Sequence, residues 1–167
     1  VSCPNVSNFT KLQDVAFLET LIPKLKEINS KKTKPKPILI KISPDLSTEQ
    51  LDETINLVLD QNLDGIIATN TTTSRKNLNT SSFQLNKIGN GGLSGLPLTN
   101  QSTEVIRYIA KKTNKKIPII GVGGIMNEND AMEKLEAGAS LLQIYTGFIY
   151  NGPSLIKNIN KKILSCT

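Results

Sequence analysis

Short runs of consecutive apolar, mostly β-branched residues alternate along the chain with amphipathic segments. Four such runs predict β-strands, at Pro37–Ile42, at Asp64–Thr69, from Ile117 onward and from Leu141 onward. The last two stop abruptly at glycine or a small hydroxyl residue, and their unbroken apolar character is typical of strands buried on both faces. Apolar residues at helical spacing predict helices over Asp14–Ile28, Ser47–Gln61, Thr99–Thr113, Asn127–Ala137 and Pro153–Leu164.

Local signals mark the ends of these helices. Ser47-Thr48-Glu49-Gln50 has the pattern of a capping box at the start of the second helix. Asn127 is a suitable N-cap for the fourth helix, and Gly138 closes it. Pro23 falls inside the first helix and predicts a bend or a break there.

The regular alternation of strands and helices predicts an α/β fold with a parallel sheet and helical crossovers. Four strand–helix units are half of a (β/α)8 TIM barrel, so we expect residues 1–167 to be the C-terminal half of one barrel domain. A small open doubly wound sheet is the alternative, but its glycine-rich turn should follow the first strand, and here the glycines come last. The long polar segment Ser74–Asn90 is predicted to be a structureless lid or binding loop.

Composition narrows the classes of function. The 167 residues contain no apolar run of about 18 residues that would span a membrane. They contain no histidine, which excludes histidine-based acid–base chemistry and most zinc sites within this segment, and no metal site is expected. Two cysteines, Cys3 and Cys166, indicate a reducing compartment rather than a disulfide framework. The chain starts at Val1, inside a motif already under way, so we expect an upstream part.

The net charge of +6 comes mostly from lysine. Such a charge favours anionic ligands or an anionic membrane surface, or it simply covers the solvent-facing sides of the helices. Basic and aromatic residues are not interleaved along the chain, so nucleic-acid binding is not expected.

The glycines that end the third strand, Gly121-Val122-Gly123-Gly124, predict a phosphate site. In a (β/α) barrel the loops after the last two strands usually hold phosphate, because bare backbone N–H groups and helix N-termini meet there. Thr146, at the end of the fourth strand, supports this interpretation. The alternative is that the glycines serve only a tight turn.

The other strand ends carry polar side chains, and barrel chemistry occurs at these ends. Lys41 ends the first strand, where a cation is unfavourable unless it meets an anion or water; it either serves the function or pairs with Asp45. Asn70 and Asn5 suit a flat ligand with amide or carboxylate groups, or else they are turn residues or helix caps. Cys3 is the only side chain near these ends able to take a proton near neutral pH, unless it is a small buried hydrophobe.

Six motifs follow one another over nearly the whole chain: Ser2-Cys3-Pro4-Asn5, Lys41-Ile42-Ser43-Pro44-Asp45-Leu46, Asp64-Gly65 through Thr69-Asn70-Thr71-Thr72, Gly91-Gly92-Leu93-Ser94-Gly95, Ile119 to Gly124 and Tyr145-Thr146-Gly147. Taken together and in this order, they resemble the motifs of the dihydroorotate dehydrogenase family. The glycine-rich run ending at Gly95 and the stretch from Tyr145 to Pro153 look most like the class 2, quinone-linked, membrane-associated branch.

The resemblance implies an FMN enzyme of pyrimidine (UMP) biosynthesis that oxidises dihydroorotate to orotate and passes the electrons to quinone. It implies that Lys41 lies beside the pyrimidine edge of the flavin, and that Cys3 stands where the family keeps its general base for the C5 proton. The residues implied to bind FMN are Lys41, Thr69, Gly95, Gly124, Tyr145 and Thr146, and those implied to bind dihydroorotate are Asn5, Asn70 and Thr71.

The sequence departs from the class 2 pattern at Cys3. Class 2 members usually have serine as the base and the soluble class 1 has cysteine, so the electron acceptor stays open at this point. A thiol ionises more easily than a hydroxyl, and Cys3 is therefore chemically competent. Another FMN-dependent barrel oxidoreductase and an inert half-barrel fragment are the alternatives.

The resemblance also implies what lies outside this segment. A flavin-binding Asn, the first barrel strands and the quinone-site helices are expected upstream of Val1, so the segment alone is expected to be inactive. The implied location is peripheral, on the cytoplasmic side of the inner membrane, with membrane contact through the upstream part. If class 1 applies instead, the implied location is the cytoplasm.

Overall fold

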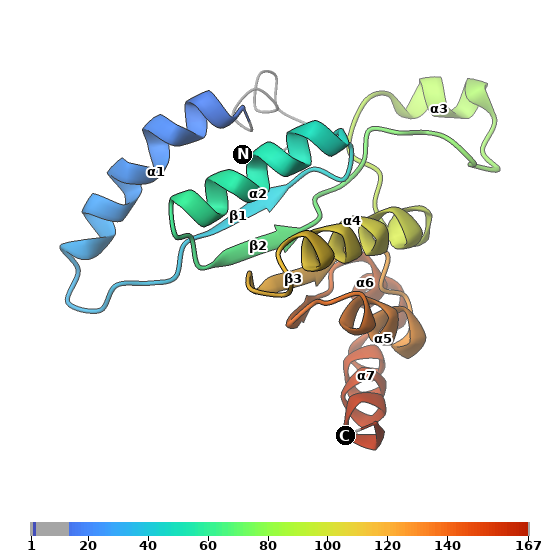
Figure 1. Ribbon diagram of the computed structural model, residues 1–167. Helices are drawn as coiled ribbons and strands as arrows, with labels where there is room; N and C mark the ends of the chain where they lie inside the picture. Colours follow the sequence, from blue (N-terminus) through green and yellow to red (C-terminus); the bar gives the residue numbers. More distant parts are fainter. Residues whose placement is uncertain (1, 3–13, 167) are drawn as a thin grey trace.

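The computed structural model describes Ser2 and residues 14–166, and its sheet contains four parallel strands (Figure 1). The strands are β1 (Leu39–Ile42), β2 (Gly65–Ala68), β3 (Ile119–Val122) and β4 (Leu141–Gln143), and they neighbour one another in chain order. The register aligns Lys41 with Ile67 and Ile67 with Ile120. The predicted parallel α/β fold is confirmed.

Helices connect the strands. The longer ones are α1 (Val15–Ser30), α2 (Thr48–Asp60), α4 (Thr99–Lys112), α5 (Glu128–Glu136) and α7 (Pro153–Ser165), at the five places where the sequence predicts helices. Reciprocal capping boxes begin α2 and α5. The shorter ones are α3 (Ser82–Ile88), α6 (Thr146–Asn151) and the 3-10 turn η2 (Leu96–Leu98).

One prediction about the helices was wrong, and of the two alternatives at Pro23 the break is excluded. The segment predicted to be structureless contains α3, which begins where the Ser81 hydroxyl accepts a hydrogen bond from the Gln84 N–H. The first helix does not break at Pro23, which lies inside α1. Leu18 and Ile22 are buried on this helix, and their tertiary packing stabilises it through a residue that is unfavourable in isolation.

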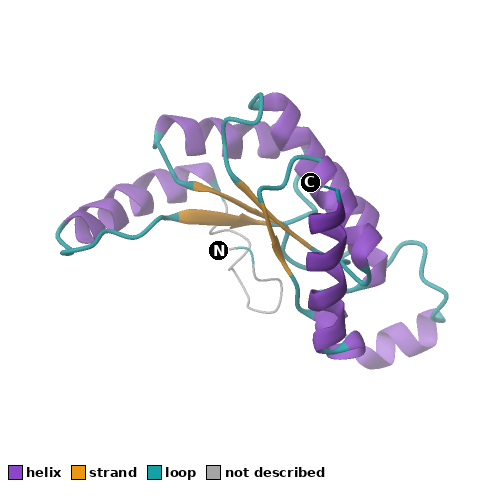
Figure 2. Ribbon diagram, turned by 90° about the horizontal axis from the view of Figure 1, so that it is seen from below, coloured by secondary structure: helices purple, strands orange, loops and turns teal. Residues whose placement is uncertain are grey.

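The helices cover one face of the sheet, as seen along the upper side in Figure 2. Ile40, Ile66 and Ile119 point to that face and are buried in the main hydrophobic cluster. Their neighbours Lys41 and Ile67 point to the opposite face and are only partly buried. The side chains of the opposite face are therefore available to line a site.

The prediction that the fourth strand is buried on both faces was wrong. Leu141 in β4 is 63% exposed, and the strand has one neighbour, β3, within the described part of the chain. An edge strand lacks the flanking strand and the covering side chains that would bury it.

Two features are absent from the described residues. None of the described helices combines the length and the apolar character needed to cross a bilayer. Within residue 2 and residues 14–166, acidic and cysteine side chains do not gather into a set that would bind a metal ion.

Candidate functional site

A pocket of about 270 Å³ opens at the carboxyl ends of the four strands. Every predicted site residue that the structure describes lines it: Lys41, Thr69, Asn70, Thr71, Gly95, Gly124, Tyr145 and Thr146. Cys3 and Asn5 lie outside the described residues, so their positions stay predictions. The rest of the lining consists of Ser94, Leu98, Val122, Gly123, Ile125, Gln143, Ile144 and Gly147.

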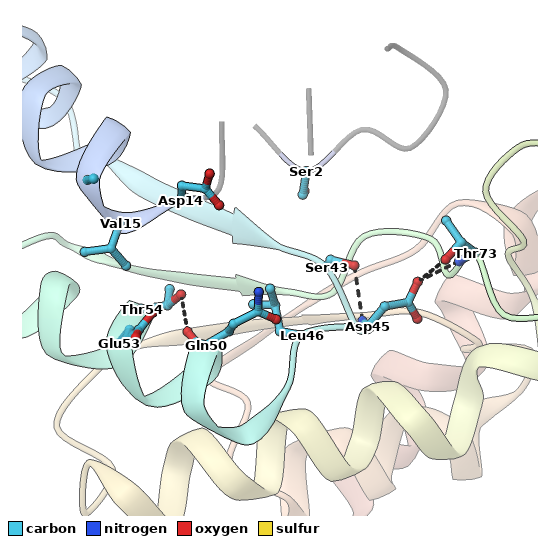
Figure 3. Close-up of a pocket in the computed structure, with 11 residues that line it drawn as sticks. Ser2, Asp14, Val15, Ser43, Asp45, Leu46, Gln50, Glu53, Thr54 and Thr73 are labelled. Atoms are coloured by element: carbon cyan, nitrogen blue, oxygen red, sulfur yellow. Dashed lines mark hydrogen bonds between the residues drawn. The ribbon is translucent and has the colours of Figure 1, made fainter. Parts of the chain in front are cut away.

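Larger hollows lie elsewhere, and none of them contains this set of residues. One of about 750 Å³ is lined by Ser2 and Asp14, which flank the segment that is not described, and by residues near the start of α2 (Figure 3). Another, of about 960 Å³, lies between the 72–77 segment and the start of α4. We therefore place the candidate site in the smaller pocket, where the strand ends converge.

Lys41 brings a cation to the pocket wall from β1. Burial lowers the pKa of its ammonium from the ordinary value of 10.5. Among the described residues it forms no ion pair, so the alternative pairing with Asp45 is not observed. A partly buried ammonium without a protein counter-ion is suited to an anionic or electron-rich ligand.

Asp45 instead joins the segments that follow β1 and β2. Its carboxylate accepts hydrogen bonds from the Thr72 hydroxyl at 2.5 Å, the Thr73 N–H at 2.7 Å and the Gln101 amide at 3.2 Å. Figure 3 shows the carboxylate turned toward Thr73. Burial raises the pKa of Asp45, but these hydrogen bonds outweigh that effect and hold it below the ordinary value of 3.8.

Asn70 and Thr71 follow β2 and present amide and hydroxyl groups. The Asn70 side-chain oxygen accepts from the Thr71 N–H at 2.9 Å, and its NH₂ group donates to the Ser2 hydroxyl oxygen at 3.0 Å. Thr69, which is buried, donates its hydroxyl to the Asn70 carbonyl at 3.0 Å. The amide is thus oriented by its neighbours.

The turn after β3 is pressed against the start of α4. Gly124 has φ +71°, and a Cβ atom at this position would overlap Thr99. The Thr99 hydroxyl donates to the Gly124 carbonyl at 2.6 Å, and the Ser102 hydroxyl donates to the Gly123 carbonyl at 2.8 Å. The N–H groups of Gly124 and Ile125 have no hydrogen-bond acceptor within the described part of the chain, so they are available to an anion.

A second close contact lines the pocket, between Gly95 and Thr146. Gly95 has φ +81°, and a Cβ atom there would come within 3.1 Å of the Thr146 methyl group. The Thr146 hydroxyl donates to the Ser94 hydroxyl at 2.9 Å. Tyr145 lines the pocket although its side chain is 77% exposed.

Arg75 clamps the base of the long loop. Its guanidinium donates to the Gly91 carbonyl at 2.6 Å and to the Thr73 carbonyl at 3.2 Å. A backbone bridge between Thr72 and Leu93 lies beside this clamp. Because the loop begins after Asn70–Thr71 and ends before Gly95, the clamp holds two pocket-lining segments together.

Sequence reasoning missed several residues around the pocket. Ser94 lies within the Gly91–Gly95 motif, and its hydroxyl in a glycine-rich run is the signal that points to it. Thr99 and Ser102 carry no signal beyond the start of a helix. Lys134 carries none either, because a lysine in an amphipathic helix is ordinarily assigned to solvent, whereas here it is fully buried.

The family model for dihydroorotate dehydrogenase matches residues 1–166. The chain belongs to the dihydroorotate dehydrogenase family. It is 57% identical to a protein of Christiangramia forsetii named dihydroorotate dehydrogenase (quinone), over 98% of this chain and 47% of the relative. The protein of the same name from Crocosphaera subtropica is 48% identical, over 98% of this chain and 44% of the relative.

Solved structures agree with this family assignment. The ligand-free dihydroorotate dehydrogenase of Eimeria tenella superimposes with a TM-score of 0.89 at 31% identity, over 99% of this chain and 49% of that one. The same enzyme in complex with ferulenol gives a TM-score of 0.88. The chain thus spans about half the length of the family members it matches.

Proposed function

We propose that the complete protein carrying this chain is an FMN-dependent, quinone-linked dihydroorotate dehydrogenase of class 2, to which residues 1–167 contribute the C-terminal half of the barrel. The observation that carries the proposal is the pocket itself, because it joins an unpaired lysine, an oriented amide and a glycine turn with free N–H groups. The names of the relatives support the same activity.

The residues present fit FMN. The turn at Gly124 and the small residues Gly95 and Thr146 leave room and N–H donors for a phosphate. Lys41 would lie beside the flavin ring, and Thr69 and Tyr145 would complete the contacts. When bound, FMN supplies the acceptor for a hydride.

The protein side of the reaction is shared among a few side chains. Oxidation to orotate removes a hydride from C6 and a proton from C5 of dihydroorotate, leaving a C5=C6 double bond. Asn70 and Thr71, with Asn5, would hold the carboxylate and ring amides. Lys41 would offset negative charge at the cofactor, and Cys3 would take the C5 proton.

The test uses the complete enzyme and two cysteine variants. The purified protein should be yellow, and dihydroorotate should bleach the flavin band without oxygen. Cys3→Ala should retain flavin and lose roughly 10²–10⁴-fold in bleaching rate, because a positioned base contributes about that much. Cys166→Ala is the matched control, since this free thiol is exposed at the end of α7.

Each outcome has a distinct meaning. Bleaching of Cys3→Ala at the wild-type rate would remove Cys3 as the base. Flavin that is bound but not reduced by dihydroorotate would indicate another FMN-dependent oxidoreductase. A colourless complete protein would contradict the FMN site itself.

We propose peripheral association with the cytoplasmic side of the inner membrane and quinone as acceptor. The support is the class of the relatives, whose names include quinone. The complete protein should sediment with membranes, be released by alkaline carbonate and reduce a soluble quinone analogue. Full recovery in the soluble fraction, without quinone reduction, would favour the class 1 alternative.

A further inference from the structure

A lysine is completely buried beneath the candidate site. Lys134, on α5, has 0% exposure. Its ammonium donates to the Thr99 carbonyl at 2.8 Å and to the Thr103 hydroxyl at 2.5 Å. Among the described residues it forms no salt bridge.

Burying an ammonium group lowers the stability of the fold unless other interactions compensate, so its presence here calls for an explanation. Taking an ammonium out of water is expensive, and a well-packed apolar side chain of similar length often serves stability as well or better. Burial lowers the pKa of Lys134 to about 8, although the carboxylates of Asp130 and Glu133 act in the opposite direction. With a pKa of about 8 the group is still mostly protonated at pH 7, and as an ammonium it donates to two acceptors on α4.

A single residue, Thr99, connects Lys134 to the glycine turn. Thr99, whose carbonyl the ammonium holds, is the residue whose hydroxyl donates to the Gly124 carbonyl at 2.6 Å. Thr103 donates its own hydroxyl to the Thr99 carbonyl at 2.9 Å. Lys134, Thr103 and Thr99 therefore form one buried hydrogen-bonded cluster that ends on the turn.

Peptide geometry determines the direction in which the N–H groups of Gly124 and Ile125 point. In a trans peptide the N–H points opposite to the C=O of the same unit. The Gly123 and Gly124 carbonyls both point to hydroxyls on α4. The N–H groups of Gly124 and Ile125 therefore point away from α4, and both residues line the pocket.

We infer that Lys134 is a positioning residue for phosphate binding: it fixes Thr99, and Thr99 fixes the turn whose N–H groups meet the phosphate. This inference rests on the proposed FMN site and adds a residue that touches neither cofactor nor substrate. It predicts that loss of Lys134 weakens binding of the phosphate and leaves binding of the flavin ring unaffected.

The experiment compares FMN with riboflavin, which lacks the phosphate. Apoprotein of the complete enzyme is titrated with each flavin, and fluorescence quenching gives both dissociation constants. Lys134→Met should weaken FMN binding roughly tenfold and leave riboflavin binding unchanged, because hydrogen bonds from a charged donor contribute about that much. Lys112→Met is the control, since Lys112 lies at the far end of α4 and pairs with Asp52 on the surface.

A double-mutant cycle tests the route through Thr99. Thr99→Val removes the hydroxyl that holds Gly124 and keeps the carbonyl that Lys134 holds. If Lys134 acts through this hydroxyl, Lys134→Met should not lower the FMN-to-riboflavin preference further in the Thr99→Val background. If Lys134→Met is insoluble, Thr103→Val removes one of the two acceptors of the ammonium and should lower the preference several-fold.

The outcomes that overturn the inference are equally definite. Equal losses for FMN and riboflavin would make Lys134 a packing residue only. An unchanged preference in both Lys134→Met and Thr103→Val, or additive losses in the cycle, would also overturn it. Wild-type apoprotein that does not prefer FMN over riboflavin would contradict the proposed FMN site, and this appears before any variant is made.

Discussion

The two walls of the pocket are built differently. On the glycine wall, Gly124 is pressed against Thr99, and the hydroxyls of Thr99 and Ser102 and the ammonium of Lys134 are buried behind it. On the other wall, at the ends of β1 and β2, Lys41 and Asn70 are partly exposed, and Lys41 has no counter-ion among the described residues. On the first wall the protein fixes the carbonyls and leaves the Gly124 and Ile125 N–H groups to a ligand, whereas on the second the Lys41 ammonium itself is left to the ligand.

This difference separates binding from chemistry. A wall that holds an unchanging phosphate benefits from contacts that fix its donors before the ligand arrives. A wall that meets changing charge must direct its polar groups to the ligand instead of to the protein. Substitutions on the first wall should therefore change affinity and stability, and those on the second should change rate.

The largest effect is expected at Lys41. In the complete enzyme, Lys41→Met should slow flavin reduction by dihydroorotate by about 10²–10³-fold, because it removes a preorganised charge from the reacting region. Anaerobic rapid mixing at the flavin band measures the rate, and FMN affinity should change only a few-fold. Lys36→Met, at an exposed lysine just before β1, is the control. A large loss of FMN affinity with an unchanged rate would reverse the assignment of the two walls.

The next effect is expected at Gly124. Gly124→Ala should lower the free energy of unfolding by about 2–4 kcal/mol and weaken FMN binding, because the added methyl group overlaps Thr99. Urea unfolding of the complete enzyme measures the first effect and flavin titration the second. Gly152→Ala is the matched control, since φ is +65° there but nothing lies within 4 Å of the new methyl group. Equal losses in both variants would attribute the effect to backbone strain alone.

The smallest effect is expected at Asp45. Its hydrogen bonds join the segments that follow β1 and β2, on the wall that contains Lys41 and Asn70. Hydrogen bonds hold its pKa below 3.8 in the folded state, so it adds stability above pH 3.8 that is lost as the pH falls through the folded pKa. Asp45→Asn should cost about 1 kcal/mol at pH 7, less than a buried charged hydrogen bond, because water screens an exposed carboxylate. Urea unfolding at a series of pH values from 7 downward measures this contribution. The acid limb is the range in which the free energy of unfolding falls as the pH falls. An equally steep acid limb in the variant would show that other carboxylates cause it.

Much of the pocket lining could be predicted from the order of strands and helices along the chain. Apolar runs and helical spacing identified the strands and the five longer helices, and parallel strands bring their carboxyl ends to one edge. Lys41, Asn70 and Gly124, which are far apart in the chain, were for that reason expected in one place, and they line one pocket. Their roles in binding and catalysis stay predictions, as do those of Cys3 and Asn5.

Periodicity by itself determined the fold class, the strand ends and the residues that face a common edge, because these depend on local spacing and on the polarity of parallel strands. Only the tertiary structure decided the exposure of Leu141, the continuity of α1 through Pro23 and the burial of Lys134. Each of these depends on which element packs against it. An apolar strand is exposed where no neighbour covers it. An ammonium is buried where a carbonyl and a hydroxyl of another helix accept its hydrogen bonds.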